Sequence, residues 1–138
     1  MSKITVPADI ENLSKVINFV DHNLETLDIP IKIKYQLELA IEEAYVNIAK
    51  YAYKNEKGDA LIKLQLKEDP LLINIQFMDS GIPYNPLEKE DPDISLKTAE
   101  KTVGGLGIYL IKKNVDYVDY EYANGKNILT IQKKLKAD

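Results

Sequence analysis

The chain has 138 residues, enough for a sizeable core, and we expect a single domain over residues 1–138. With 45% hydrophobic and 29% charged residues it has the composition of a folded globular protein. Its apolar runs fall well short of the roughly 20 residues that a membrane helix needs, so we expect a cytoplasmic protein without a membrane partner. A net charge of −4 argues against direct nucleic-acid binding, the absence of cysteine excludes disulfides and thiolate metal sites, and the single histidine argues against a histidine-based catalytic triad.

The N-terminal half predicts a strand followed by two helices. Residues 4–6 alternate as a short strand does. Asp9 can cap a helix that runs to about residue 28, because apolar residues recur there at helical spacing. Pro30 suits the first turn of a second helix, which we expect to run to about Tyr53.

The C-terminal half predicts two hairpins around a long loop and a helix. One pair of strands flanks the turn at Asp69-Pro70, and the other flanks Asn124-Gly125, a common hairpin turn. Between them the periodicity fades over residues 79–105, and loops of this length in small domains are usually functional. The strands are expected at residues 60–66, 71–78, 117–122 and 127–134, and the helix at 106–114.

This order of elements predicts an α+β fold. Strands in sequential hairpins pair antiparallel, and the helices must bury their apolar faces against one side of the sheet. We therefore expect a two-layer α/β sandwich with a mixed, mostly antiparallel sheet and the helices on one face.

The second predicted helix carries a local group of polar side chains. Glu43, Asn47 and Lys50 are separated by four and three residues, so they share one helical face, and Tyr51 follows directly. The amide oxygen of Asn47 suits a hard metal ion, and Lys50 can balance phosphate charge. Glu43 can act as a base, or as a hydrogen-bond acceptor for a group that itself binds the metal. The alternative is an amphipathic helix with an ordinary solvated side.

A second group of residues follows an apolar strand at Asp79-Ser80-Gly81-Ile82-Pro83-Tyr84-Asn85-Pro86. A carboxylate at a strand end can accept a hydrogen bond from a ligand, and a glycine beside it leaves room for close approach. Asp-Ser-Gly is also good turn chemistry, so the alternative is a turn that closes the strand.

The third group is Gly104-Gly105-Leu106-Gly107 at the start of an apolar helix. Glycines at a helix start expose free backbone N–H groups, which bind anions such as phosphate. The segment matches neither a P-loop nor a dinucleotide-binding fingerprint. A flexible loop before a helix is the alternative.

In this order the three groups resemble the asparagine box and the two glycine boxes of the histidine kinase-like ATPase superfamily. Within it the chain looks most like the anti-sigma-factor serine/threonine kinases, on residues 38–47 and 104–113. Residues 79–86 match that group's Asp-x-Gly-x-Pro-Phe-Asp-Pro pattern, with Tyr84 and Asn85 as changes. The likeness extends from residue 4 to residue 135.

The resemblance implies a Bergerat ATP-binding fold, with ATP and Mg²⁺ as cofactors. It implies that Asn47 holds Mg²⁺, that Asp79 accepts from the adenine amino group with Gly81 beside the ring, and that residues 87–103 form a lid. It also implies that Glu43 is the general base for a serine or threonine hydroxyl. The remaining expected nucleotide contacts are Lys50, Tyr51, Gly104, Gly105, Leu106 and Gly107.

The function that the resemblance implies is an anti-sigma factor that phosphorylates an anti-anti-sigma antagonist and binds a sigma factor, with a homodimer as the expected assembly. Kinases of this group commonly carry an arginine near the second glycine box, and all 18 Lys and Arg residues of this chain are lysines. A nucleotide-gated binding switch without phosphate transfer is therefore the main alternative. A sensor histidine kinase fragment that uses His22, and a structural protein without nucleotide, are two others.

Overall fold

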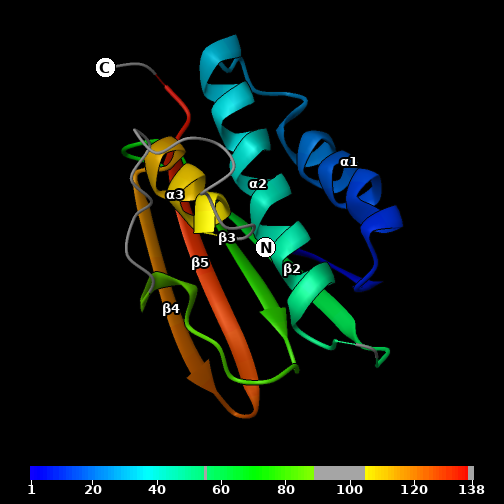
Figure 1. Ribbon diagram of the computed structural model, residues 1–138. Coiled ribbons are helices and arrows are strands. Elements are labelled where there is room, and N and C mark those ends of the chain that lie inside the picture. The colour runs from blue at the N-terminus through cyan, green and yellow to red at the C-terminus, as the bar shows by residue number, and fades with distance from the viewer. Residues whose placement is uncertain (55, 89–104, 137–138) are drawn as a thin grey trace.

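The computed structural model describes residues 1–54, 56–88 and 105–136, and these form two layers. Figure 1 shows the three helices together on one face of a twisted sheet. The elements are β1 (Ser2–Pro7), α1 (Leu13–Leu24), α2 (Ile31–Tyr51), β2 (Asp59–Lys67), β3 (Leu72–Asp79), α3 (Gly105–Asn114), β4 (Tyr117–Ala123) and β5 (Lys126–Lys134), with short 3₁₀ turns at Ile10–Asn12 and Pro86–Glu88.

The sheet has the strand order β1-β2-β3-β5-β4, and every neighbouring pair is antiparallel. Both predicted hairpins are present, as β2–β3 and β4–β5. Asn124 and Gly125 have φ angles of 54° and 76°, the left-handed backbone that a two-residue type I′ turn requires. The predicted two-layer α+β sandwich is confirmed, with an antiparallel sheet over the described strands.

Alternation along β3 decides which side chains face the helices. Ile73, Ile75 and Phe77 are buried, while the residues between them are half-buried on the other face. Because successive side chains of a strand point to opposite faces, Asp79 continues the buried series and also faces the helices. A carboxylate therefore ends the inward-facing row of the central strand.

Helix α2 is the principal cover of the sheet. Its buried residues recur at three- and four-residue spacing, so one face of the helix packs on the strands. Tyr45 is fully buried and its hydroxyl donates to the carbonyl of Asp9 at 2.6 Å and accepts from the Asp9 amide at 3.2 Å, which fixes the connection between β1 and α1. The buried residues of α2 are Leu37, Ala40, Ile41, Ala44, Tyr45 and Ile48.

The bounds of the first helix differ from the prediction. Asp9 caps a 3₁₀ turn, since its carboxylate accepts from the amide of Glu11 at 3.0 Å, and α1 begins only at Leu13. At the other end the Leu27 amide bonds to the carbonyl of Leu24 at 3.0 Å, a contact of three residues instead of four. This tightened turn ends the helix at Leu24, before the predicted residue 28.

Helix α2 ends at Tyr51, close to the predicted residue 53, and the chain then reverses. Lys54 has a φ angle of 50°, which the α-helix does not allow. The hydroxyl of Tyr53 donates to the carbonyl of Asp59 at 2.6 Å and accepts from the amide of Ser80 at 2.8 Å. These bonds tie the end of α2 to the start of β2 and to the loop that follows β3.

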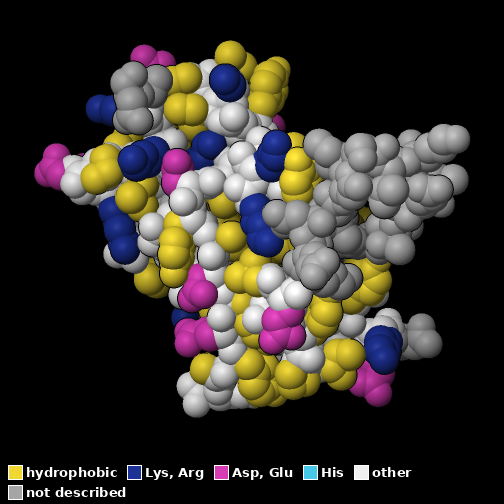
Figure 2. Space-filling model, turned by 60° about the vertical axis from the view of Figure 1, so that its left-hand side comes forward, with side chains coloured by type: hydrophobic (Ala, Val, Ile, Leu, Met, Phe, Trp, Pro, Cys, Tyr) yellow, Lys and Arg dark blue, Asp and Glu magenta, His cyan; other side chains and the backbone are white. Residues whose placement is uncertain are grey.

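The surface carries both signs of charge. Lysine and acidic side chains are both spread over the face shown in Figure 2, with hydrophobic side chains between them. Among the described residues, no helix is long and apolar enough to span a membrane.

Candidate functional site

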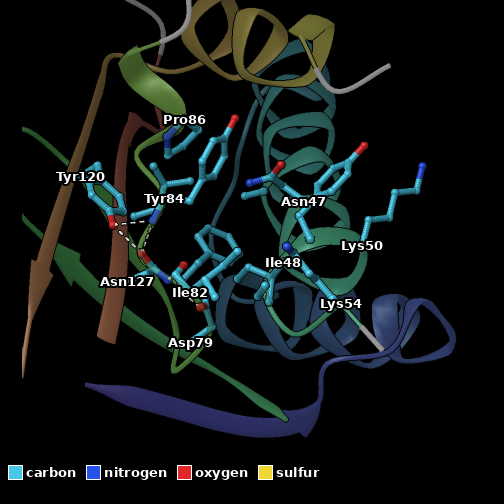
Figure 3. A pocket seen from close by; sticks show the side chains of 15 residues that line it. Asn47, Ile48, Lys50, Lys54, Asp79, Ile82, Tyr84, Pro86, Tyr120 and Asn127 are labelled. Carbon is cyan, nitrogen blue, oxygen red and sulfur yellow. Dashed lines mark hydrogen bonds between the residues drawn. The ribbon is translucent and has the colours of Figure 1, made fainter. Parts of the chain in front are cut away.

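A cavity of about 320 Å³ lies between the C-terminal half of α2 and the strand ends of β3, β4 and β5. This volume is at the lower end of the range for small-molecule sites. In Figure 3 Asp79 and Asn127 lie on the strand side of the cavity, and Asn47 and Lys50 lie on α2 opposite them. The lining residues are Ala44, Asn47, Ile48, Lys50, Tyr51, Ala52, Lys54, Phe77, Asp79, Ile82, Tyr84, Pro86, Tyr120, Asn127 and Leu129.

Asp79 supplies the carboxylate of this cavity. The residue is 7% exposed, and its Oδ1 accepts from the Gly81 amide and from Nδ2 of Asn127, each at 2.9 Å. Its Oδ2 accepts no hydrogen bond from the described residues. Every fully buried side-chain oxygen or nitrogen among these residues has a hydrogen-bond partner, so an oxygen without one is not fully buried. Oδ2 is therefore accessible, and the cavity is the space that Asp79 lines.

The rest of the cavity wall is mainly apolar. Phe77 and Leu129 come from the strands and Ile48 from α2, and all three are buried. At the rim Ile82 is 51% exposed and Tyr84 is 37% exposed, so apolar surface faces solvent at the mouth of the cavity. An apolar slot with one free carboxylate oxygen suits a flat heteroaromatic ring that carries an amino group.

The α2 wall adds a polar edge. Asn47 lines the cavity one helical turn before Lys50 and Tyr51, as its position on the shared face predicted. Lys50 and Lys54 lie at the rim, and in Figure 3 the Lys50 ammonium points away from Asp79. Two ammonium groups at the mouth of an apolar slot provide positive charge for an anionic substituent on the ring.

Glu43 lies beside the cavity and against helix α3. It is absent from the cavity lining, and a Cβ placed on Gly107 would lie 3.0 Å from its Oε2. Burial raises the pKa of Glu43, and the charge of Glu42 raises it further, while Lys50 opposes both. The carboxylate therefore lies over the first turn of α3, held in a partly dehydrated position.

Gly81 is close to the cavity but is not one of the residues that line it. A Cβ on Gly81 would lie 2.1 Å from the carbonyl oxygen of Ala52, and the Ile82 amide donates to that same oxygen at 3.2 Å. The missing side chain thus makes room for the end of α2, whereas the sequence pattern led us to expect room for a ligand.

The third sequence group is described only in part. Gly104 lies outside the described residues, as does most of the expected lid at residues 87–103. Gly105 and Leu106 form the start of α3, where their backbone N–H groups have no earlier helical turn to bond. Gly107 faces Glu43, so the structure brings the first and third groups together.

Sequence reasoning missed several residues of the cavity wall, of which Asn127 and Tyr120 matter most. Asn127 pairs directly with Asp79 in the β3–β5 register, and Tyr120 lies on the next strand. One feature of the sequence could have indicated Asn127. It is a polar residue that begins the alternating series of β5 residues facing the helices, which the buried Leu129 and Ile131 continue. Lys54 gave no periodic signal, since it lies beyond the end of the helix.

Comparison with known families supports a nucleotide site. A family model described as the histidine kinase-like ATPase domain matches residues 6–133 of this chain. The serine-protein kinase RsbW of Bacillus cereus strain AH187 is 34% identical over 97 residues, and RsbW of Bacillus mycoides strain KBAB4 is 33% identical over the same length. Each match covers 67% of this chain but only 59% of the relative's length.

Two solved structures share the fold. The RsbU and RsbW domains of Rv1364c from Mycobacterium tuberculosis match 100% of this chain and 34% of that one, with a TM-score of 0.68 and 14% identity. The histidine kinase domain of a blue-light activated kinase from Erythrobacter litoralis EL346 matches 94% of this chain and 62% of that one, with a TM-score of 0.56 and 13% identity. At these identities the likeness concerns the fold.

Proposed function

The chain belongs to the histidine kinase-like ATPase domain family, and on that premise we propose that its cavity binds ATP and that the protein is a serine kinase and anti-sigma factor. The observation that carries the proposal is the free Oδ2 of Asp79 at the wall of an apolar slot. We propose that this oxygen accepts a hydrogen bond from the 6-amino group of adenine.

The apolar walls fit the adenine ring. Phe77, Ile48 and Leu129 offer apolar surface to its faces, and Ile82 and Tyr84 at the rim lose exposed area when a ring covers them. Burial of apolar area contributes about 25 cal/mol for each Å² that is removed from water. The Asp79 carboxylate then fixes the orientation of the ring.

We propose that the phosphates leave the slot between α2 and the start of α3. The Asn47 side-chain oxygen is of the type that Mg²⁺ prefers, and it would hold the ion against the phosphates. The free N–H groups at Gly105, Leu106 and Gly107 would face the phosphate oxygens. Lys50 and Lys54 would supply positive charge at the cavity mouth, with Tyr51 beside them. Gly104 lies outside the described residues and stays a phosphate contact expected from the sequence.

Glu43 is the proposed general base. Its carboxylate would take the proton from a protein serine or threonine hydroxyl as that oxygen attacks the terminal phosphorus and ADP leaves. Burial raises its pKa, which makes it a stronger base than an ordinary exposed glutamate, and the nearby charge of Lys50 opposes that rise. The arginine that often stabilises charge in phosphoryl transfer is absent from the sequence, so lysine would take that role.

The partners are proposed from the relatives. The related Bacillus proteins are named serine-protein kinase RsbW, which supports a serine kinase. With the resemblance seen in the sequence, we propose that this chain phosphorylates an anti-anti-sigma protein and binds a sigma factor. A homodimer, a single domain over residues 1–138 and a cytoplasmic location remain predictions from the sequence.

Calorimetry with ATP and Mg²⁺ tests the cavity. In Asp79→Asn the Gly81 amide and the Asn127 amide still require an acceptor at the Oδ1 position, so the new NH₂ group takes the Oδ2 position and faces the cavity. A donor there opposes the adenine amino group, and we expect ATP affinity to fall at least about tenfold. Asp119→Asn, at an exposed position of β4, is the matched control and keeps wild-type affinity.

Labelled phosphate transfer to the organism's own anti-anti-sigma proteins tests the chemistry. Glu43→Ala should lose transfer and keep ATP binding, while Glu25→Ala, at an exposed glutamate after α1, should keep both. Transfer that survives in Glu43→Ala contradicts the assignment of the base. ATP binding without any transfer by the wild type would favour a nucleotide-gated switch instead.

A further inference from the structure

Asn127 joins three segments of the cavity wall through its side chain. Its Nδ2 donates to Oδ1 of Asp79 and to the carbonyl of Ile82, each at 2.9 Å. Its Oδ1 accepts from the Tyr84 amide at 3.1 Å and from the hydroxyl of Tyr120. Figure 3 shows this group of side chains on the strand side of the cavity. Strand β3, the loop after it and strand β4 therefore meet at one amide.

These bonds use the full capacity of the amide. A side-chain amide has two N–H donors and one oxygen with two lone pairs, and each has a partner here. A flipped amide would set NH₂ against the Tyr84 N–H, so the network fixes the orientation. Asn127 is 7% exposed and offers no free hydrogen-bonding group to a ligand.

The bond from Asn127 also changes what Asp79 can offer. Oδ1 of Asp79 already accepts from Gly81 and from Asn127, which leaves Oδ2 as the single acceptor for a ligand. Adenine presents one donor, its 6-amino group. Guanine presents two adjacent donors, at N1 and at its 2-amino group, and needs both carboxylate oxygens to bind them together, while its 6-oxo group is an acceptor that a carboxylate repels.

We propose that Asn127 is a positioning residue that makes the cavity select adenine over guanine nucleotides, by occupying Oδ1 of Asp79 and holding Oδ2 towards the ligand. The proposal rests on ATP binding in this cavity. Asn127 would set base selectivity without contacting the nucleotide itself, because it bonds to Asp79 and to the loop after β3.

Tyr120 and Tyr84 support this arrangement from the outer side. The Tyr120 hydroxyl donates to Oδ1 of Asn127 and accepts from the Tyr84 amide at 3.3 Å. Burial raises the pKa of Tyr120, and the charge of Asp79 raises it further, so the hydroxyl keeps the proton that it donates. Tyr120→Phe removes one of two donors to Asn127 Oδ1 and should have a smaller effect than loss of the amide.

The test compares the affinities of ATP and GTP, each with Mg²⁺, by calorimetry. Asn127→Ala removes one of the two donors to Oδ1 of Asp79 and leaves the Gly81 amide there, so the carboxylate is held less firmly and can turn. We therefore expect the preference for ATP over GTP to fall about tenfold or more. The matched control is Asn74→Ala, because Asn74 is an amide-bonded asparagine on the opposite face of β3, where it accepts from Gln132 at 3.0 Å. This control should keep the wild-type preference.

Asn127→Asp provides a second reading within one protein. At about pH 8 the new carboxylate faces Asp79 without a proton to donate, and at about pH 5 the pair holds a shared proton that can bridge to Oδ1. The preference for ATP should therefore increase as the pH falls in this variant and change much less in the wild type. Since both readings come from one variant, a difference in folding between variants does not affect them.

The outcomes separate this proposal from the proposed function. An unchanged ATP-to-GTP ratio in Asn127→Ala, with both affinities lowered equally, would mean that the amide only stabilises the fold. A pH-independent ratio in Asn127→Asp would contradict the proposal as well. If the wild type binds no ATP, the proposed function itself fails, whatever the variants do.

Discussion

Replacing Gly81 by alanine perturbs the candidate site at one defined point. The added Cβ would lie 2.1 Å from the carbonyl oxygen of Ala52, 2.6 Å from its carbonyl carbon and 2.9 Å from its Cα. Ordinary contacts of a Cβ begin at 3.4 Å, so the loop after β3 must move by about 1.3 Å from the end of α2. These neighbours are backbone atoms of a helix end, which cannot rotate away as a flexible side chain can.

The magnitude follows from what this movement disturbs. Overpacking of this kind typically costs about 1–3 kcal/mol. The Ile82 amide would also lose its bond to the Ala52 carbonyl, now 3.2 Å, at a further cost of about 1 kcal/mol. We expect Gly81→Ala to lower the free energy of unfolding by roughly 2–4 kcal/mol, a large part of the ~5–15 kcal/mol of a typical domain.

Urea unfolding of the wild type and Gly81→Ala measures this difference, and calorimetry with ATP measures its effect on the site. The shift of the loop weakens the Gly81 bond to Asp79, now 2.9 Å, so ATP affinity should fall together with stability. Ser80→Ala, one residue earlier at an exposed position, keeps the backbone bonds and serves as the control. A Gly81→Ala protein with wild-type stability would refute the steric reasoning.

Three further predictions concern the α2 helix and its neighbours. In Gly107→Ala the added Cβ would lie 3.0 Å from Oε2 of Glu43, so the carboxylate should be displaced. We expect phosphate transfer to fall about tenfold or more with little loss of ATP affinity, and transfer at the wild-type rate would contradict this. Burial raises the folded-state pKa of Glu43, so the stability that its protonation confers is present at low pH and lost as the pH rises. Glu43→Gln should therefore stabilise the fold more at about pH 8 than at about pH 4, and an equal gain at both pH values in thermal unfolding would argue against this. Tyr45→Phe should cost about 0.5–1.5 kcal/mol in urea unfolding, since it removes the hydroxyl that bonds to Asp9, although the Asp9 amide keeps its bond to the Pro7 carbonyl and the Asp9 carbonyl keeps its bond from the Asn12 amide. A variant with wild-type stability would count against that role of the hydroxyl.

The elements of the fold could be predicted because their signals are local. Alternation in β3 and β5, and three- to four-residue spacing in α2, each indicate one buried face. The ends of α1 were less predictable. Asp9 is a good cap, but a 3₁₀ turn uses it before the helix starts, and no local pattern distinguishes that turn from the first turn of the helix.

The residues of the candidate site also differ in whether local sequence patterns could predict them. Asp79, Asn47, Lys50 and Tyr51 were predicted from local motifs, and the structure brings them to one cavity. Asn127 lies 48 residues from Asp79 in the sequence, and its position depends on the register of β3 with β5, which a single sequence does not reveal. The sequence also does not reveal why residue 81 must be glycine, because the atoms that a side chain would meet belong to Ala52, at the end of a helix far earlier in the chain.

The most direct test of the account removes the amino group from the nucleotide. The triphosphate of purine riboside is ATP without the 6-amino group, and its affinity can be compared with that of ATP on the wild type and on Asp79→Asn. We predict that the wild type binds the analogue about tenfold or more weakly than ATP, and that Asp79→Asn binds the two equally or prefers the analogue. The same loss on both proteins would mean that Asp79 does not contact the amino group, and would contradict the proposed site.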